Sequence, residues 1–214
     1  MKMRTAFNMR AGIVRTARAG FTLLETMIAA GIFTVVGYSV AQAVRMGNHS
    51  QTTVMQVAAG DRSLRAATSS LVDDIRTSAD AQINVMTLAD GNNQVRYMIP
   101  ITVAGVPSWG VYDPTLGTDP ASQNRAGWSI QYTVRTVIGT NGGPDKQLVR
   151  QILDDTLAVR KEKVIIDWVR TGVAVPPGFK VAKVGSVWQI TLSTLGSSAS
   201  TTGISTVFDV HTRN

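Results

Sequence analysis

The sequence predicts an α+β fold, in which a long N-terminal helix, membrane-spanning in its first half, packs on an antiparallel β-sheet. Three observations predict it. A run of 24 residues near the N-terminus contains a single formal charge. The segment that follows keeps apolar side chains at helical spacing. From about residue 92 onward, apolar and polar residues alternate, as they do in half-buried strands.

The apolar run covers residues 21–44 and reads FTLLETMIAAGIFTVVGYSVAQAV. As a helix that rises about 1.5 Å per residue, it spans roughly 36 Å, enough to cross a hydrocarbon core of about 30 Å. Basic side chains precede the run and Arg45 closes it, so the positive-inside bias places the N-terminus in the cytoplasm and the C-terminal bulk outside. We therefore expect a single-pass inner-membrane protein. A helix buried in a soluble core is the alternative, and an ordinary signal peptide, whose apolar region is about 7–15 residues, fits less well.

The charge of the chain is concentrated at its N-terminus. The formal net charge of +7 comes from 21 Lys+Arg and 14 Asp+Glu among 214 residues. Residues 1–20 hold five of the basic side chains and no acidic one, so the other residues carry 16 basic and 14 acidic groups, a net of +2. The excess of positive charge in residues 1–20 is therefore interpreted as a signal for membrane orientation. It gives little support to nucleic-acid binding. The chain has no cysteine, which excludes disulfides, Cys-based zinc sites, iron–sulfur clusters and thiol catalysis.

Glu25 is the charged residue within the apolar run. An ionisable group at membrane depth is costly and normally has a partner. We identify no group in the run that would pair with it, so we expect the partner to come from another chain or from the backbone amine of a processed N-terminus. A carboxylate in an apolar bundle is tolerated when an ammonium group lies within a few ångströms.

Residues 18–25, RAGFTLLE, resemble the processing site of the type IV prepilin family, which lies at the N-terminal end of the apolar helix. The resemblance implies cleavage between Gly20 and Phe21 by a prepilin peptidase, and N-methylation of Phe21 by the same class of enzyme. It also implies that Glu25, the fifth residue of the mature chain, meets the Phe21 amine of a neighbouring subunit during assembly.

A helical pattern continues beyond the membrane run. Apolar residues recur every seven positions at Val57, Leu64 and Leu71, and Val54, Val72 and Ile75 lie close to the same face. This pattern predicts an amphipathic helix laid on a domain. We therefore expect a leader at 1–20, a membrane or filament-core helix at 21–44, its amphipathic continuation at 45–80 and a globular β domain at 81–214.

Alternating residues predict six or more short antiparallel strands in the β domain, near 95–101, 128–135, 147–153, 164–168, 188–192 and 207–210. The second and third strands are expected to form a hairpin around a Gly- and Asn-rich turn at 140–145. Residues 104–127 are rich in Gly, Pro and Asp and predict a long surface loop. Residues 193–203 predict a second loop.

A second resemblance covers the β domain. The order of the segments GWSIQY at 127–132, LVR at 148–150, VWQITL at 187–192 and the final Arg213-Asn214 is similar to minor pilins and to J-type minor pseudopilins of type II secretion. The intact Glu25 argues against the K-type pseudopilin, and the absence of cysteine argues against major pilins with a disulfide-closed loop. The resemblance implies a subunit of a type IV pilus or a secretion pseudopilus. Its partners would be prepilin peptidase, other pilin or pseudopilin subunits, the inner-membrane assembly platform and, before assembly, membrane lipid.

No pattern points to enzyme chemistry, a cofactor or a metal. G-x-S-x-G, Walker A, G-x-G-x-x-G and H-E-x-x-H motifs are missing. Two histidines, His49 and His211, do not make a metal site, and the loop residues Asp113, Asp119 and Asp145 lack calcium-loop spacing. Adjacent Asp73 and Asp74 do not share a helix face, so we expect a helix-end or turn role rather than acid–base work.

DNA or surface binding by the exposed domain is the alternative function. It rests on a set of basic side chains in the β domain: Arg125, Arg135, Arg150, Arg160, Lys161, Lys163, Arg170, Lys180 and Lys183. Phosphate contacts from such a set would supply affinity for DNA. Acidic residues interleave with the set, however, so a mixed solvated surface is the preferred interpretation.

Overall fold

A computed structural model describes residues 22–138, 144–169, 178–195 and 203–212. The chain forms two compact units, which divide after Ser50. One helix, α1 (Leu23–Thr77), continues through the division, and the predicted long N-terminal helix is confirmed.

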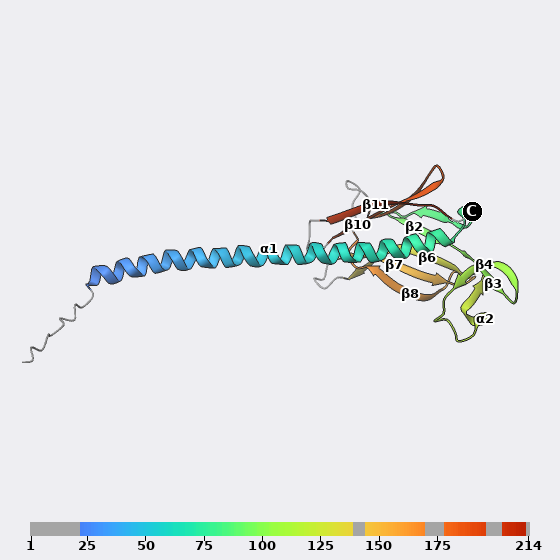
Figure 1. Ribbon diagram of the computed structural model, residues 1–214, viewed down its shortest axis with the longest axis horizontal. Coiled ribbons are helices and arrows are strands. Elements are labelled where there is room, and N and C mark those ends of the chain that lie inside the picture. The colour runs from blue at the N-terminus through green and yellow to red at the C-terminus, as the bar shows by residue number, and fades with distance from the viewer. Residues whose placement is uncertain (1–21, 139–143, 170–177, 196–202, 213–214) are drawn as a thin grey trace, which may run out of the picture. The chain divides into compact units, whose positions relative to one another are not determined.

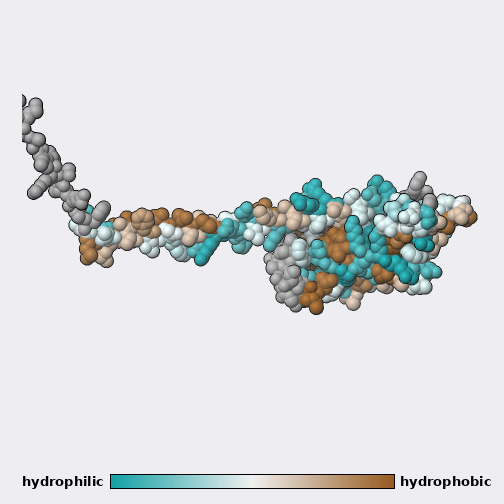
Figure 2. Space-filling view, turned by 90° about the horizontal axis from the view of Figure 1, so that it is seen from below, coloured by the Kyte–Doolittle hydropathy of each residue, from teal (hydrophilic) through white to brown (hydrophobic). Residues whose placement is uncertain are grey.

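The first unit is the N-terminal part of α1. Every side chain from residue 22 to residue 50 is exposed apart from Gln42, which is half-buried. By length and composition, α1 is apolar enough in this part to cross a membrane. Figure 2 shows hydrophobic atoms along this part of the helix. The apolar side chains here are therefore not covered by any described part of this chain.

The second unit contains the rest of α1 and three antiparallel sheets (Figure 1). The largest has the strand order β1-β2-β6-β7-β8, with β1 (Asn84–Thr87), β2 (Asn93–Tyr97), β6 (Ser129–Ile138), β7 (Pro144–Leu153) and β8 (Val159–Ile166). A three-stranded sheet has the order β11-β10-β9, with β9 (Phe179–Val184), β10 (Val187–Leu195) and β11 (Gly203–Val210). The third has the order β3-β4-β5, with β3 (Ile99–Val103), β4 (Val106–Tyr112) and β5 (Asn124–Ala126). Two short helical turns, η1 (Asp80–Gln82) and α2 (Pro120–Gln123), complete the unit.

The core lies between the C-terminal part of α1 and the sheets, which confirms the α+β fold. Helix residues three or four apart on one face are buried: Gly60, Leu64, Ala67, Leu71 and Ile75. The last four of these join one hydrophobic cluster with residues of the five-stranded sheet and of β9 to β11. Figure 1 shows this part of α1 between β10–β11 and β7–β8.

The predicted packing stripe begins too early. Val54 and Val57 are 64% and 39% exposed, so the expectation that they lie on the packed face is wrong. Their spacing continues the pattern of Leu64 and Leu71, but burial on α1 begins only at Gly60. The heptad shows which face is apolar and does not show how far along the helix the sheets extend.

The strand predictions hold in part. The hairpin of 128–135 with 147–153 is confirmed as β6 paired with β7, whereas most of its turn lies outside the described residues. The single strand expected at 95–101 is wrong, because β2 and β3 belong to different sheets. Strand pairing is interrupted between them at Met98. The Met98 carbonyl accepts a hydrogen bond from Ser78 Oγ at 2.8 Å. The predicted loop at 193–203 is wrong for its first residues, which extend β10 to Leu195; residues 196–202 lie outside the description.

The predicted surface loop at 104–127 is also wrong, because it contains β4, α2 and β5. Several of its glycines and prolines lie in or beside the strands of the small β3-β4-β5 sheet. Gly105, with φ of 83°, makes the tight turn between β3 and β4. A Cβ at Gly110 would lie 2.0 Å from the carbonyl oxygen of Arg125, so only glycine allows β4 and β5 to approach this closely. The glycines that read as loop residues therefore mark a tight turn and a close strand approach.

Candidate functional site

The candidate site is the start of α1 together with the apolar surface that follows it. Of the predicted site residues, Gly20 and Phe21 lie outside the described residues. Glu25 lies in the first turn of α1. The structure therefore reports on the surroundings of the glutamate and leaves the cleavage and methylation positions as predictions.

Thr22 and Glu25 form a capping box at the N-terminus of α1. The backbone N–H of Thr22 donates to Glu25 Oε2 at 2.9 Å, and the Thr22 hydroxyl donates to the same oxygen at 3.1 Å. In return, the backbone N–H of Glu25 lies 3.3 Å from Thr22 Oγ1. Such reciprocal bonds satisfy backbone donors that have no partner within the first turn.

The expectation that no group in the run pairs with Glu25 is therefore wrong, because Thr22 does. The physical reason is the spacing: a glutamate three residues after a threonine N-cap reaches back to the cap. The T-x-x-E pattern at the start of the run is a known sequence signature of this motif and would have predicted the contact.

The capping box leaves capacity for a cation. Both bonds from Thr22 go to Oε2, and within the described residues no hydrogen bond reaches Oε1. The carboxylate also lies at the positive end of the helix dipole, which favours its charged form. The first turn therefore presents a fixed anion with one open oxygen.

The polar side chains of the apolar run bond to their own helix. The hydroxyls of Thr26, Thr34 and Ser39 donate to backbone carbonyls three or four residues earlier, at 2.8, 2.8 and 2.9 Å. The amide of Gln42 donates to Tyr38 OH at 2.9 Å. Internal pairing of this kind lowers the cost of placing hydroxyls in lipid or in a helix bundle.

A comparison with protein-family models matches residues 15–37 to the prokaryotic N-terminal methylation motif. The matched segment includes Gly20, Phe21 and Glu25. The motif indicates a type IV pilin-like precursor. Searches of curated proteins and of solved structures found no match. The pilin-like assignment therefore rests on the N-terminal segment and on the α+β organisation of the chain.

In the second unit of the pilin-like chain, a polar cluster holds α1 to the five-stranded sheet. Asp74 Oδ2 accepts hydrogen bonds from Arg150 Nε at 2.8 Å and from Tyr132 OH at 2.7 Å. Since the Tyr132 hydroxyl donates to Asp74, Ser70 Oγ donates to Tyr132 across 2.9 Å. The Tyr132 ring also stacks on Tyr97.

The cluster shifts the titration of its members. Burial and the neighbouring Asp74 carboxylate raise the pKa of Tyr132 well above its usual range. Burial alone would lower the pKa of Arg150, but Asp74 more than offsets it and the pKa is raised. The expectation of a helix-end or turn role did not separate Asp74 from its neighbour Asp73. Asp74 lies three residues after the buried Leu71 and contacts Tyr132 and Arg150 of the sheet, whereas Asp73 is exposed.

A second polar anchor follows the end of α1. Asp80 accepts hydrogen bonds from Lys183 Nζ at 2.6 Å, Trp188 Nε1 at 2.8 Å and Thr212 Oγ1 at 2.6 Å. These bonds, that from Lys183 above all, lower the pKa of Asp80 to about 2. One carboxylate thus joins the helix end to β9, β10 and the segment after β11.

Several of the basic side chains singled out for DNA contact have acidic partners. Ion pairs join Arg135 to Glu162, Arg150 to Asp74, Arg160 to Asp154, Lys161 to Asp113 and Lys183 to Asp80. These pairs cancel part of the positive charge of the domain surface.

The loop carboxylates weighed for calcium have other uses where the structure shows them. Asp113 accepts bonds from Lys161 and Thr115, and Asp119 accepts bonds from Ser122. Within the described ranges, no group of three metal-ligating side chains comes together, and His49 and His211 join none.

Proposed function

We propose that this chain is a minor pilin or minor pseudopilin subunit, cleaved after Gly20, methylated on Phe21 and assembled into a filament through its apolar helix. One observation carries the proposal. The match to the methylation motif overlies the start of α1, where the apolar side chains from Leu23 to Val44 are all exposed. Such a surface needs lipid before assembly and other helices after it.

The mechanism is mechanical. Moving the helix from lipid into a filament core requires helix–helix packing in place of lipid contacts. Ala29, Ala30, Gly31 and Gly37 are small, and no side chain of the described residues covers either glycine. Small residues of this kind allow helices to approach closely. In this proposal the mature subunit catalyses no covalent reaction. Its function is to be added to and removed from the helical filament.

Glu25 would act at the moment of entry. Its carboxylate is held by Thr22 through one oxygen, so a methylated Phe21 amine of a neighbouring subunit would meet an anion that is already positioned. An ammonium–carboxylate pair in an apolar bundle is worth most when water is excluded. The pairing would fix the axial position of one subunit against the next.

The finer assignment, a minor subunit of J type, comes from the order of the β6, β7 and β10 sequence segments. β6 and β7 are interior strands of the five-stranded sheet and β10 is the central strand of the β11-β10-β9 sheet, where apolar alternation is needed for packing. A type IV pilus and a type II secretion pseudopilus remain the two machines into which such a subunit would fit.

The first experiment tests processing. When the chain is coexpressed with a prepilin peptidase, we expect Gly20→Leu to accumulate at full length. Gly31→Ala, which alters a glycine with open space around it, should be processed like the wild type. Normal cleavage of Gly20→Leu would remove the cleavage proposal.

The second experiment separates two roles of Glu25. Glu25→Gln keeps a side chain that completes a capping box but removes the charge, whereas Glu25→Ala removes both. If the carboxylate pairs with a neighbouring amine, both variants should be processed and both should be depleted from filaments. Incorporation of Glu25→Gln at the wild-type level would limit Glu25 to capping.

The alternative function, DNA binding by the exposed domain, is less well supported. The ion pairs described above neutralise five of the cations on which it depends. Salt-dependent retention of the chain on DNA would favour it, and no retention at low salt would count against it.

A further inference from the structure

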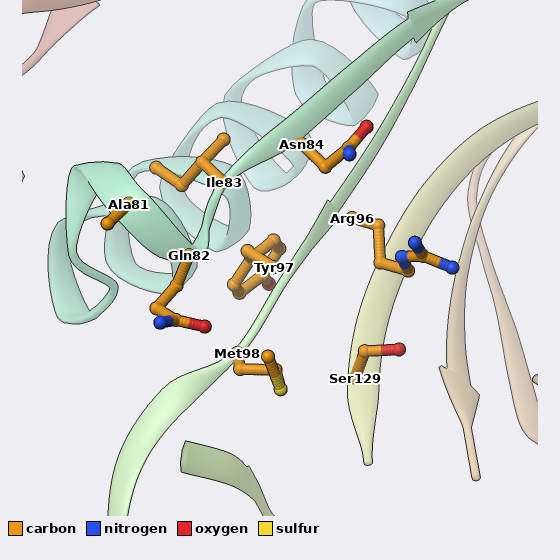
Figure 3. Close-up of a pocket in the computed structure, with 8 residues that line it drawn as sticks. All are labelled: Ala81, Gln82, Ile83, Asn84, Arg96, Tyr97, Met98 and Ser129. Atoms are coloured by element: carbon orange, nitrogen blue, oxygen red, sulfur yellow. The ribbon is translucent and has the colours of Figure 1, made fainter. Parts of the chain in front are cut away.

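A pocket of about 240 Å³ lies at the β1–β2–β6 end of the five-stranded sheet. Eight residues line it: Ala81, Gln82, Ile83, Asn84, Arg96, Tyr97, Met98 and Ser129 (Figure 3). Arg96 is the charged residue among them, and no acidic side chain contributes. The lining therefore combines one guanidinium with neutral amide and hydroxyl groups.

Three of the polar groups lie on the sheet face turned away from α1. Tyr132 and Arg150 face α1, so Gln131, next to Tyr132, faces away from it. Arg96 is the cross-strand partner of Gln131, and Asn84 is the partner of Arg96. Ser129, two residues before Gln131, lies on this face too. In Figure 3, the side chains of Arg96 and Ser129 extend in the same direction from neighbouring strands.

Elsewhere on this face, polar side chains form hydrogen bonds with one another. A ladder of hydrogen bonds crosses four strands, from Gln94 to Gln131 at 2.8 Å, from Gln131 to Gln151 at 3.0 Å and from Gln151 to Glu162 at 2.7 Å. Arg135 pairs with Glu162 at the side of the ladder. Polar groups on this face are thus paired across neighbouring strands.

The pocket end of the face is different. Ser129 is 5% exposed, and its buried hydroxyl has no hydrogen-bond partner among the described residues. The same part of the chain offers no ion-pair or hydrogen-bond partner to the half-buried Arg96 guanidinium, and no side-chain bond to Asn84 or Gln82. An unpaired buried hydroxyl is costly, and a free guanidinium is a strong bidentate donor. Both are explained if another molecule supplies the acceptors.

We propose that this pocket binds a small molecule that carries an oxyanion, a carboxylate or a phosphate. The Arg96 guanidinium would donate to the anion, and Ser129 Oγ and the Asn84 amide would donate to its remaining oxygens. Met98 would contact an apolar part. The pocket volume limits the ligand to a small molecule. None of the pocket residues belongs to the apolar run at 21–44, and the proposal does not rest on the pilin-like function.

The test is calorimetric titration of the full-length chain in detergent with inorganic phosphate and with succinate, at constant ionic strength. We expect saturable binding of at least one anion, and the stronger of the two identifies the class. A charge-assisted hydrogen bond to a ligand corresponds to roughly tenfold or more in affinity, so Arg96→Gln should weaken binding by about that factor. Lys163→Gln, which removes an exposed cation from β8, should leave binding unchanged.

Ser129→Ala gives a result that a purely structural role would not. Removing an unpaired buried hydroxyl should leave the melting temperature without ligand unchanged or higher, while weakening anion binding. This variant also keeps the test open if Arg96→Gln fails to fold. No saturable binding of either anion, or equal binding by wild type, Arg96→Gln and Ser129→Ala, would overturn the proposal.

Discussion

The two parts of α1 belong to one continuous helix and have opposite relations to their own chain. From Leu23 to Val44 the helix is predominantly apolar, and no side chain from Leu23 to Ser50 is buried. From Gly60 to Ile75 it buries a single stripe and exposes charged residues on the other faces. The same secondary structure is thus stabilised by the domain in one part and exposed for lipid or other subunits in the other.

This difference shows where function and stability reside. A side chain in the second part stabilises the folded domain and should matter little to membrane insertion. A side chain in the first part contributes little to the domain and should matter to insertion and assembly. Matched substitutions in the two parts of α1 should therefore differ in their effect on the stability of the domain.

The largest effect is expected from Ile75→Ala. Ile75 is 0% exposed, and truncating a buried isoleucine costs about 2–5 kcal/mol in the free energy of unfolding. Ile32→Ala is the matched change in the first part, where the side chain is 59% exposed, and it should change domain unfolding by less than about 0.5 kcal/mol. Urea denaturation of the full-length chain in detergent, followed by tryptophan fluorescence, measures both. Equal losses of unfolding free energy in the two variants would contradict the conclusion that only the second part of α1 stabilises the domain.

A smaller effect is expected from Asp74→Ala, at about 2 kcal/mol, because it leaves Arg150 and Tyr132 without their shared acceptor. The neighbouring Asp73→Ala is the control, since Asp73 is exposed and should cost less than about 0.5 kcal/mol. The same denaturation series compares them. A loss from Asp73→Ala as large as that from Asp74→Ala would show that the cluster does not hold the helix to the sheet.

The pH dependence tests the anchor at the end of α1. The pKa of Asp80 is lowered from 3.8 to about 2, so its stabilising contribution is present above about pH 4 and is lost as pH falls toward 2. Asp80→Asn should remove that part of the acid-induced loss. Thr212→Val, which removes one of the three donors, should act in the same direction with a smaller amplitude. Stability measured between pH 2 and 6 that falls equally in wild type and Asp80→Asn would refute this role.

The smallest effect is expected from Thr22→Val, which removes the capping hydroxyl. Loss of an N-cap costs about 1 kcal/mol, and the effect should be confined to the first turn of α1. Hydrogen exchange should accelerate at the amides after Thr22 and stay unchanged in the β domain, while Thr22→Ser should behave like the wild type. Unchanged first-turn exchange in Thr22→Val would show that the capping box does not stabilise the helix start.

Much of the fold could be predicted because the responsible patterns are local. The apolar run, the face of Leu64 and Leu71 and the alternation from Trp128 to Val134 all depend on residue spacing. The long helix and the β6–β7 hairpin follow from them. The T-x-x-E capping box is equally local: the three-residue spacing from Thr22 to Glu25 encodes it, whereas the charge of Glu25 alone does not.

The rest depends on contacts between distant residues. Asp74 and Arg150 are brought together by the packing of α1 on β7, and no pattern in either segment encodes the pairing. The fit of Gly110 beside the Arg125 carbonyl likewise turns a glycine that reads as loop into a packed strand position. The unpaired Ser129 and Arg96 are recognisable only once their neighbours are known.

The most direct test of the central claim is the mass and N-terminal sequence of the mature chain isolated from cells that contain a prepilin peptidase. We predict a chain that begins at Phe21 and carries one methyl group on its terminal amine, with Glu25 as its fifth residue. A chain that retains residues 1–20, or one that begins at another position without methylation, would contradict it and would favour an uncleaved, signal-anchored domain.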